Sequence, residues 1–255
     1  GRGSTFGNGT RTQLLCLGAT SSWARGCSSA WATQAHRLVL AVRDLTELER
    51  IASDIRLLFA SNVQVTELDL DNTESLATRW SDIEAAHGDF DGVLMAAGWM
   101  PEDNDAMRRD TPALQVIPRN FTGPVALLNA AADVFEARKK GFIVGISSVA
   151  GDRGRQSNYL YGAAKGGFGI YLAGLRNRLF ASGVPVLTIK PGFVDTRMTW
   201  GLPGLFLVAD PMQLGEQIVQ AQAAGKNTVY LPSFWRLIML IIQHVPEFVF
   251  KRLKL

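Results

Sequence analysis

Short apolar runs alternate along the chain with longer stretches in which apolar residues recur at helical spacing. The runs are Gln13–Leu17, Arg37–Val42, Val63–Leu68, Gly92–Ala96, Phe142–Ser147, Val184–Lys190 and Thr228–Leu231. They lack the polar alternation of strands with one exposed face, which is typical of parallel strands covered on both faces. The pattern therefore predicts a sheet that is packed on both sides.

The stretches between these runs are long enough for crossover helices. In Thr46–Leu58 the apolar residues follow a 3-4-3 spacing on one helical face, and they are Leu48, Ile51, Ile55 and Leu58. Alternating strands and helices predict an α/β fold of Rossmann type, a doubly wound parallel sheet of about seven strands with helices on both faces. Such sheets bind ligands beyond the carboxyl ends of their strands, so we expect the functional residues at those ends.

The length of 255 residues suits a single α/β domain, and a hydrophobic content of 47% excludes global disorder. We expect residues 1–12 to be a disordered leader or tag, residues 13–233 to form one domain, and residues 234–255 to be an apolar and basic extension. No run of 18 apolar residues is present, so no conventional membrane span is predicted.

The histidines and cysteines are few and scattered. The three His and two Cys residues match neither zinc-finger nor HExxH spacing, so we expect no metal. Cys16 and Cys27 form no CxxC motif, which favours a reduced, cytoplasmic setting.

The net charge of +3 is located at one end of the chain. Residues 236–255 hold four basic side chains against the single acid Glu247, whereas the remaining residues balance at 22 basic and 22 acidic. So small an excess excludes nucleic acid as the expected partner. The tail is too short and broken to span a bilayer, but it is suited to lie in a membrane interface, with an anionic surface or a phosphate-bearing lipid as partner. A helix that completes the core, or a dimer contact, remains the alternative.

A glycine follows the first strand, in the sequence Gly18-Ala19-Thr20-Ser21-Ser22-Trp23-Ala24. Glycine permits a tight turn and close approach to a phosphate, the hydroxyl side chains offer donors, and the next helix offers its positive N-terminus. The GxGxxG form is absent, so an ordinary Gly-Thr-Ser turn is the alternative.

The tips of the second and third strands carry candidate nucleotide-binding side chains. The second ends in Ala41-Val42-Arg43-Asp44, and a guanidinium there suits a 2′-phosphate, which favours NADP over NAD. Arg43 as a solvated surface residue, and Asp44 as a ribose acceptor, are the alternatives. Asp69, at the tip of the third strand, can accept from the adenine amino group or cap the next helix.

Ser148, Tyr161 and Lys165 form the most specific pattern in the chain. Ser148 follows an apolar strand, and Tyr161 and Lys165 are four residues apart, on one face of a helix. An adjacent ammonium favours the phenolate, so we expect Lys165 to lower the pKa of Tyr161 toward the working range. The Ser148 hydroxyl can donate to a carbonyl oxygen that gains negative charge.

These residues resemble the classical short-chain dehydrogenases/reductases from about Gln13 to Leu231. The matching segments are LGATSSWA, Asp69, Ala96-Ala97-Gly98, Asn120 in RNFTGP, ISSVAG, YGAAK and PGFVDT. The resemblance implies a catalytic tetrad in which Asn120 anchors a water relay, Ser148 polarises the carbonyl, Tyr161 is the general acid/base and Lys165 binds the nicotinamide ribose. It implies that the cofactor contacts Gly18, Thr20, Ser21, Ser22, Trp23, Arg43, Asp69, Leu70, Ala96, Ala97, Gly98, Tyr161, Lys165, Pro191, Gly192, Val194 and Thr196.

The chain departs from the family pattern in three places. Ser22 and Ala24 replace the second and third glycines, Met95 begins the segment that usually reads NNAG, and the first helix, expected at 24–35, is unusually polar. Small residues at positions 22 and 24 still permit close approach, but the bulky Trp23 would lie beside the pyrophosphate.

Within the family the pattern is most similar to members like decaprenylphosphoryl-2-keto-pentose reductase. The segments concerned are GISSVAGDRGRQSNYLYGAAKG, KPGFVDTRMT and the tail from Thr228. The resemblance implies an NADP-dependent reduction of a ketone, with a lipid-linked keto-sugar as one substrate. A generic ketone or alcohol dehydrogenase for small soluble substrates and a non-catalytic dinucleotide-binding regulator are the alternatives. By resemblance we also expect a homodimer or homotetramer, cytoplasmic or peripheral to the inner face of the membrane.

Overall fold

The computed structural model describes residues 12–18, 22–32, 37–43, 45–59, 62–99, 110–192 and 211–253. Its strands are β1 (Gln13–Leu17), β2 (Arg37–Val42), β3 (Asn62–Glu67), β4 (Gly92–Met95), β5 (Ile143–Ile146), β6 (Val186–Pro191) and β7 (Thr228–Leu231). Its helices are α1 (Ser22–Ala32), α2 (Leu45–Phe59), α3 (Leu76–His87), α4 (Asp110–Ile117), α5 (Gly123–Arg138), α6 (Tyr159–Leu179), α7 (Pro211–Ala223), α8 (Trp235–His244) and α9 (Glu247–Phe250). A π-helical segment, η3 (Pro118–Thr122), joins α4 to α5, and a 3-10 turn, η4 (Val149–Gly151), precedes α6.

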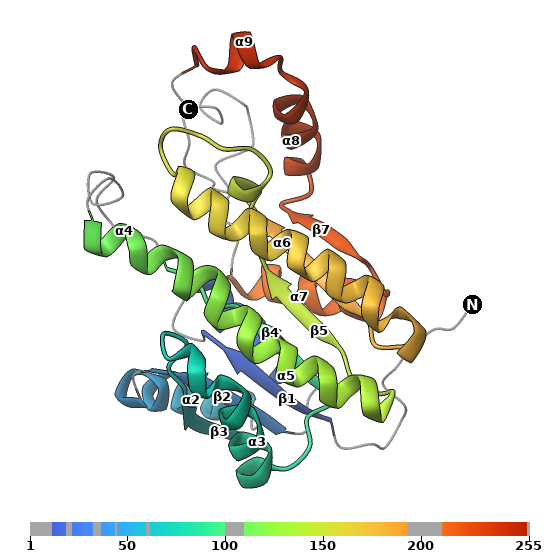
Figure 1. Cartoon of the computed structure of the whole chain (residues 1–255). Helices are drawn as coiled ribbons and strands as arrows, with labels where there is room; N and C mark the ends of the chain where they lie inside the picture. The colour runs from blue at the N-terminus through green and yellow to red at the C-terminus, as the bar shows by residue number, and fades with distance from the viewer. Residues whose placement is uncertain are drawn as a thin grey trace.

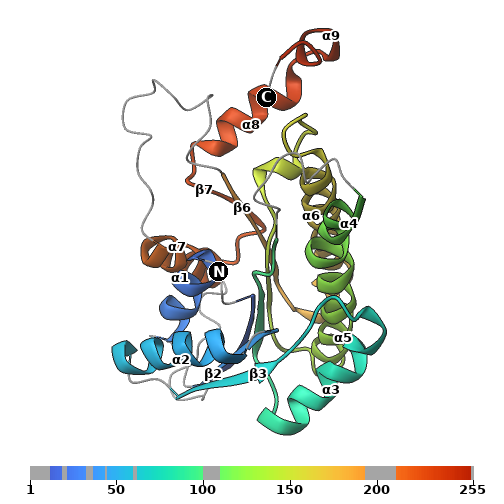
Figure 2. The same cartoon turned by 90° about the vertical axis from the view of Figure 1, so that its left-hand side faces the viewer.

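The strands form one parallel sheet in the order β3-β2-β1-β4-β5-β6-β7. Figures 1 and 2 show α3, α5 and α6 on one face of this sheet and α1, α2 and α7 on the other. The order reverses between β1 and β4, because the chain builds the sheet outward from β1 in one direction and from β4 in the other. This confirms the predicted doubly wound fold and places its switch point beside the Gly18 turn.

The core has two halves because successive residues of a strand point to opposite faces. In β1, Leu14 and Cys16 join the cluster beneath α1, α2 and α7, whereas Leu15 and Leu17 join the cluster beneath α3, α5 and α6. All four are 2% exposed or less. The unbroken apolar runs in the sequence thus reflect burial on both sides.

The polar helix α1 packs closely against α7. A Cβ added at Gly215 of α7 would overlap the backbone of Gly26 in α1, so the two helices approach at glycines. The side of α1 that faces the sheet buries Cys27, Ala30 and Trp31. The buried face of α1 therefore consists of small and aromatic side chains, where a typical amphipathic helix has a stripe of aliphatic ones.

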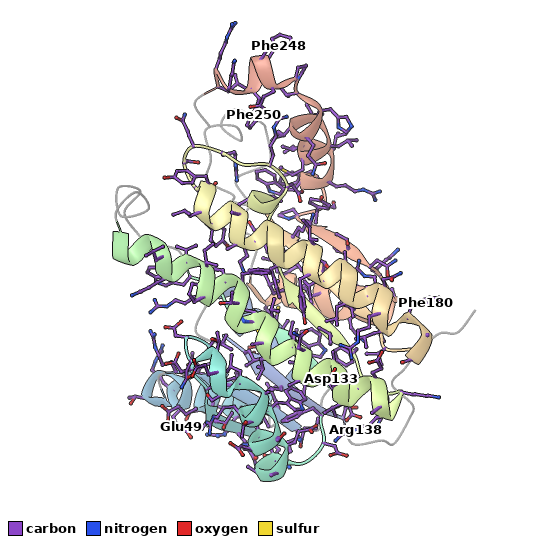
Figure 3. All side chains as sticks on the ribbon, in the orientation of Figure 1. Glu49, Asp133, Arg138, Phe180, Phe248 and Phe250 are labelled. Carbon is purple, nitrogen blue, oxygen red and sulfur yellow. The ribbon has the colours of Figure 1, made fainter. Side chains whose placement is uncertain are left out.

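The last two helices lie beyond the carboxyl ends of the strands (Figure 1). Helix α8 buries Trp235, Met239 and Ile242 against Val149 of η4, and α9 adds Phe250 to the same cluster. Figure 3 shows Phe250 turned toward the rest of the chain and Phe248 at the outer end of the molecule, where it is exposed. Of the helices in the described ranges, none has the length and apolar content to cross a membrane.

Candidate active site

Ser148 and Tyr161 meet where β5 gives way to α6. Ser148 follows β5 and caps η4, with its Oγ accepting a hydrogen bond from the Ala150 N–H at 3.1 Å. Helix α6 packs on η4 and carries Tyr161 in its first turn, where the phenol hydrogen-bonds the Ser148 side chain. The structure thus brings the predicted hydroxyl pair into direct contact.

Burial controls the acidity of Tyr161. It raises the pKa of the phenol to about 12, and the hydrogen bond with Ser148 opposes only part of that rise. The expected lowering of this pKa by Lys165 is therefore wrong for the protein by itself, because desolvation outweighs the attraction of the ammonium. At neutral pH the phenol is protonated and can act as an acid.

Lys165 lies one helical turn after Tyr161 and is 2% exposed. Its Nζ donates to the main-chain carbonyl of Ile146, the last residue of β5, at 2.9 Å and to that of Ala97, which follows β4, at 3.1 Å. The same Nζ lies 5.9 Å from the centre of the Tyr161 ring. Burial lowers the pKa of Lys165 to about 8, so the ammonium persists at neutral pH but is poised to lose its proton just above it.

Asn120 occupies the π-helical segment between α4 and α5. Pro118 lacks an N–H and interrupts the regular helical hydrogen bonds there, and such wide turns often occur at functional sites. The fully buried Asn120 side chain binds Trp99 at both backbone groups: Oδ1 accepts from N at 3.0 Å and Nδ2 donates to O at 2.6 Å. Nδ2 also donates to the Val116 carbonyl at 2.8 Å.

Gly98 brings the last two predicted residues together. A Cβ at position 98 would lie 3.1 Å from Nζ of Lys165 and 3.3 Å from Oδ1 of Asn120. The two side chains therefore converge on Gly98, where any larger residue would push them apart by a few tenths of an ångström. Ser148, Tyr161, Lys165 and Asn120 all lie at the carboxyl ends of β4 and β5, where ligands of such sheets bind.

A cavity of about 180 Å³ begins beside this group and runs along the tips of β1, β2 and β3. Its lining includes predicted cofactor residues, namely Gly18, Arg43, Asp69, Leu70, Ala97 and Gly98. Gly18 has a φ of 79°, and a Cβ there would lie 2.6 Å from the Ala97 backbone. Only glycine suits that conformation and that spacing, so the first turn keeps the close backbone approach that a dinucleotide phosphate requires.

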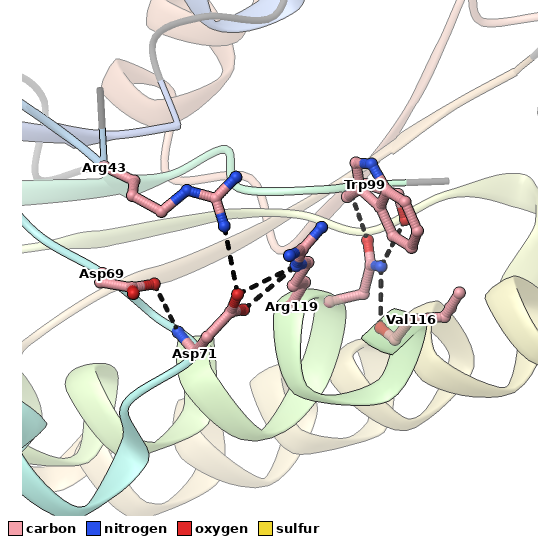
Figure 4. Close-up of polar contacts among 7 residues, drawn as sticks. Arg43, Asp69, Asp71, Trp99, Val116 and Arg119 are labelled. Atoms are coloured by element: carbon pink, nitrogen blue, oxygen red, sulfur yellow. Dashed lines mark hydrogen bonds and ion pairs between the residues drawn. The ribbon is translucent and has the colours of Figure 1, made fainter. Parts of the chain in front are cut away.

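Arg43 shares one carboxylate with a second arginine at the rim of this cavity. Figure 4 shows Asp71 between them, with Nη1 of Arg43 at 3.3 Å and Nε of Arg119 at 3.1 Å from its Oδ2. The guanidinium of Arg119 also lies 4.7 Å from the centre of the Trp99 ring. Asp69 accepts from the Asp71 N–H at 3.0 Å, so it closes its own turn rather than capping a helix.

Sequence reasoning missed Asp71, Arg119 and Trp99, which line the same cavity. Each is next to a predicted site residue in the sequence, and this proximity was the only sign that it could line the same cavity. The other predicted cofactor residues are less fully described. Four of them lie outside the described residues, namely Thr20, Ser21, Val194 and Thr196. Ser22 and Trp23 begin α1 without described side chains, and Ala96 is buried beside the cavity. Pro191 is the last residue of β6, and Gly192 follows it.

Comparisons with known proteins agree with this arrangement. The family model described as short chain dehydrogenase matches residues 13–203. An uncharacterized oxidoreductase of Mycobacterium tuberculosis is 30% identical over 216 residues, which cover 85% of this chain and 87% of the relative. In fold, the chain is similar to an actinorhodin polyketide ketoreductase with NADPH, at a TM-score of 0.76 and 19% identity over 88% of this chain and 96% of that one. A short-chain dehydrogenase from Sphingobium yanoikuyae in complex with NADPH gives a TM-score of 0.75 and 22% identity, over 92% and 97% of the two chains.

Proposed function

The chain belongs to the short-chain dehydrogenase family and is an oxidoreductase, and from that premise we propose that it reduces a ketone to a secondary alcohol with NADPH. The observation that carries the proposal is the contact between Ser148 and Tyr161 beside the buried Lys165. A protein that only bound a dinucleotide would need no such group of side chains. This argues against the non-catalytic regulator.

In the proposed mechanism Tyr161 is the general acid. Its phenol is protonated at neutral pH because burial raises its pKa to about 12. When bound, the dinucleotide supplies a hydride for the carbonyl carbon. Tyr161 then gives its proton to the carbonyl oxygen, and the Lys165 ammonium stabilises the phenolate left behind. The Ser148 Oγ accepts from Ala150, and its own hydrogen, which bonds the Tyr161 phenol in the protein by itself, would turn to the same carbonyl oxygen when the ketone binds.

The preference for NADPH rests on Arg43 and on the fold neighbours. Arg43 lies at the tip of β2 with an exposed guanidinium on the wall of the cavity, where a 2′-phosphate would reach it. Two similar structures contain NADPH. Arg43→Ala should abolish a preference for NADPH over NADH in equilibrium titrations of both, and equal affinities in the unaltered protein would refute the assignment.

The proposal is tested by a screen for NADPH oxidation across keto-sugars, aliphatic ketones and acyl-chain ketones. The matched control is Tyr161→Phe, which keeps the ring and removes the acid. Turnover should fall about 100- to 10,000-fold while NADPH binding persists. Turnover of the variant at the unaltered rate would exclude Tyr161 as the acid.

A lipid-linked keto-sugar is the substrate that the tail favours over a small soluble ketone. Helices α8 and α9 leave large apolar side chains exposed, and these are Leu237, Leu240, Ile241, Phe248 and Val249. Basic residues of the same segment, Arg236, Lys251 and Arg252, are also exposed. Apolar residues flanked by cations favour contact with an anionic membrane surface over a contact with a second copy.

Vesicle binding tests the contact of the tail. The full chain should bind phosphatidylglycerol vesicles and not phosphatidylcholine vesicles, and Leu240→Gln with Phe248→Gln should remove the binding. Ile170→Gln, an equally exposed apolar residue on α6, is the control. Vesicle binding that the double variant leaves unchanged would exclude the tail, and a change of oligomeric state in that variant would favour a dimer contact.

The proposal also includes the organisation of the chain. We place one catalytic domain over residues 13–233, the tail over residues 234–255, and the assembled homodimer or homotetramer in the cytoplasm. Thr12, just before this domain, is buried, and its carbonyl accepts from the Arg37 N–H at 3.2 Å. Analytical ultracentrifugation of the full chain determines the number of copies.

A further inference from the structure

We propose that Arg155 and Asn158 form a binding site for an anionic group, a phosphate or a carboxylate, that the ketone substrate carries. The two residues lie in the loop between η4 and α6, which runs from Ser148 to Tyr161. That the anion belongs to a substrate rests on the proposed function. The anion site itself rests on the contacts of this loop.

The Arg155 side chain is a buried cation without a counter-ion. It is 7% exposed, and its Nε and Nη2 are buried without a hydrogen-bond partner. Within the part of the chain that the structure describes, no carboxylate forms an ion pair with it. Buried charges in proteins are normally paired, because the loss of hydration is costly when nothing replaces it. A buried guanidinium that the described residues leave unpaired therefore indicates an anion from outside that part of the chain.

The neighbours of Arg155 in the loop are fully engaged elsewhere. Asp152 is the only acidic residue of the segment 152–158, and its carboxylate binds Lys190 and Tyr230. Arg153 donates to main-chain carbonyls at the end of α8 and pairs with Glu247 at 3.0 Å. The loop thus satisfies its other charges and leaves only that of Arg155 open.

Asn158 supplies a second open group three residues further along the same loop. Its Oδ1 is buried without a hydrogen-bond donor, and although it is the N-cap residue of α6 its side chain makes no capping bond. The first turn of α6 contains no acidic residue. The positive end of the helix dipole and the guanidinium favour an anion, and the unpaired Oδ1 suits a hydroxyl next to it.

This site is fixed relative to the reacting groups. The Arg155 carbonyl accepts from the Asn158 N–H at 3.2 Å, and the Asn158 carbonyl accepts from the Gly162 N–H at 2.8 Å, next to Tyr161. The two ends of the loop are joined by the hydrogen bond between Ser148 and Tyr161. In this proposal a ketone whose oxygen contacts Ser148 and Tyr161 places its anionic group against the same loop, and the class of substrate is a hydroxylated ketone with an anionic group.

Binding of inorganic phosphate tests the site without turnover. The full chain, saturated with NADPH to fill the cofactor site, is titrated calorimetrically with phosphate and with acetate. The unaltered protein should bind one of them. Arg155→Gln should lose the binding, as should Asn158→Asp, which places a carboxylate beside the guanidinium. Arg178→Gln, which removes an exposed cation near the other end of α6, should retain it.

Stability separates a ligand site from a structural role. Replacing an unpaired buried charge should not lower the Tm, so Arg155→Gln is expected to be at least as stable as the unaltered protein without phosphate. A clear fall in Tm for this variant, together with no binding of either anion by the unaltered protein, would overturn the proposal.

Matched ketones identify the source of the anion. A keto-sugar phosphate is compared with the same sugar without phosphate, and a keto acid with its ester. For the anionic member of the preferred pair, Arg155→Gln should raise KM about 10- to 100-fold, as expected for one charged hydrogen-bonding contact, and leave kcat and the neutral member unchanged. Equal effects on both members would refute the site. If neither the unaltered protein nor the variant reduces any ketone, the proposed function fails. The phosphate titration still shows whether the anion site exists.

Discussion

Asp71 binds Arg119 through both oxygens of its carboxylate, with Nε at 3.2 Å from Oδ1 and 3.1 Å from Oδ2. The same carboxylate holds Arg43 at 3.3 Å (Figure 4). The cation expected to bind a 2′-phosphate is thus already paired with an internal anion. Arg119 reduces the resulting competition, because it shares the charge of Asp71.

Asp71→Asn should strengthen the binding of NADPH about two- to fivefold and leave that of NADH nearly unchanged. The exposed pair between Arg43 and Asp71 contributes no more than about 1 kcal/mol, and its loss frees the guanidinium for phosphate. Fluorescence titration with both cofactors measures the change. Asp82→Asn removes another exposed carboxylate that is paired with an arginine, on α3, and serves as the control.

The converse substitution checks the role of Arg119 in the same experiment. Arg119→Leu leaves Asp71 to Arg43 alone, so NADPH should bind more weakly than to the unaltered protein. Arg119→Leu combined with Asp71→Asn should recover the lost affinity. If Arg119→Leu weakens NADH and NADPH equally, with or without Asp71, the arginine acts through packing on Trp99 instead.

The parts of the site that could be predicted are those set by local spacing. Tyr161 and Lys165 share a helix face at four residues' separation, and Ser148 closes an apolar strand, so periodicity alone located them. The pair of Asp71 and Arg119 spans 48 residues and forms only when η3 packs beside the end of β3. No local pattern reveals such a contact. Most of the strands were predictable because they are apolar runs, whereas the edge strand β3, NVQVTE, has polar residues at alternate positions and is only partly buried.

The Tyr161 phenol should remain protonated in the cofactor-free protein at every pH below about 11. Its pKa of about 12 lies above the ordinary value because burial disfavours the phenolate. Ultraviolet difference titration of the unaltered protein against Tyr161→Phe isolates this phenol. A phenolate that appears between pH 7 and 9 would contradict the expectation and restore the lowering by Lys165.

The error over this pKa shows what the sequence could not supply. The spacing places an ammonium near the phenol, and attraction between the two would lower the pKa. Desolvation acts in the opposite direction, and its size depends on how η4, α6 and the Lys165 side chain enclose the ring. How deeply a side chain is buried is a property of the assembled fold, and for Tyr161 it decides whether the pKa is raised or lowered.

Lys165 should make the stability of the protein depend on pH between about 8 and 10.5. Its pKa is about 8 in the folded chain and about 10.5 in the unfolded one, so the unfolded state binds the proton more readily. Below pH 8 this difference lowers the free energy of unfolding by its full amount, on the order of 3 kcal/mol, and the loss disappears as the pH rises to about 10.5. Urea unfolding should show the unaltered protein gaining stability relative to Lys165→Met over this range. Parallel curves would contradict the low pKa.

Asn120→Leu should lower the free energy of unfolding by about 2–4 kcal/mol. The substitution leaves three backbone groups without partners, namely the N–H and carbonyl of Trp99 and the carbonyl of Val116. Asn129→Leu on the exposed side of α5 loses only one surface hydrogen bond, to Tyr171, and should cost less than about 1 kcal/mol. Equal losses in the two variants would mean that Asn120 does not organise the segment.

Arg153 should hold α9 in place. Its guanidinium donates to the carbonyls of Ile242 and Val245 and lies 3.7 Å from the centre of the Phe250 ring, so one side chain joins the catalytic loop to the tail. Helix α8 keeps its buried contacts without it, whereas α9 has Phe250 as its one buried residue.

Arg153→Gln should therefore speed amide hydrogen exchange in α9 about tenfold or more, with little change in α8 or the sheet. Glu247→Gln removes only the exposed ion pair to Arg153 and should have a much smaller effect. Because Arg153 and Arg155 lie in one loop, the same variant should also weaken phosphate binding if the tail keeps that loop in shape. Unchanged exchange in α9 would show that packing of Phe250 is sufficient.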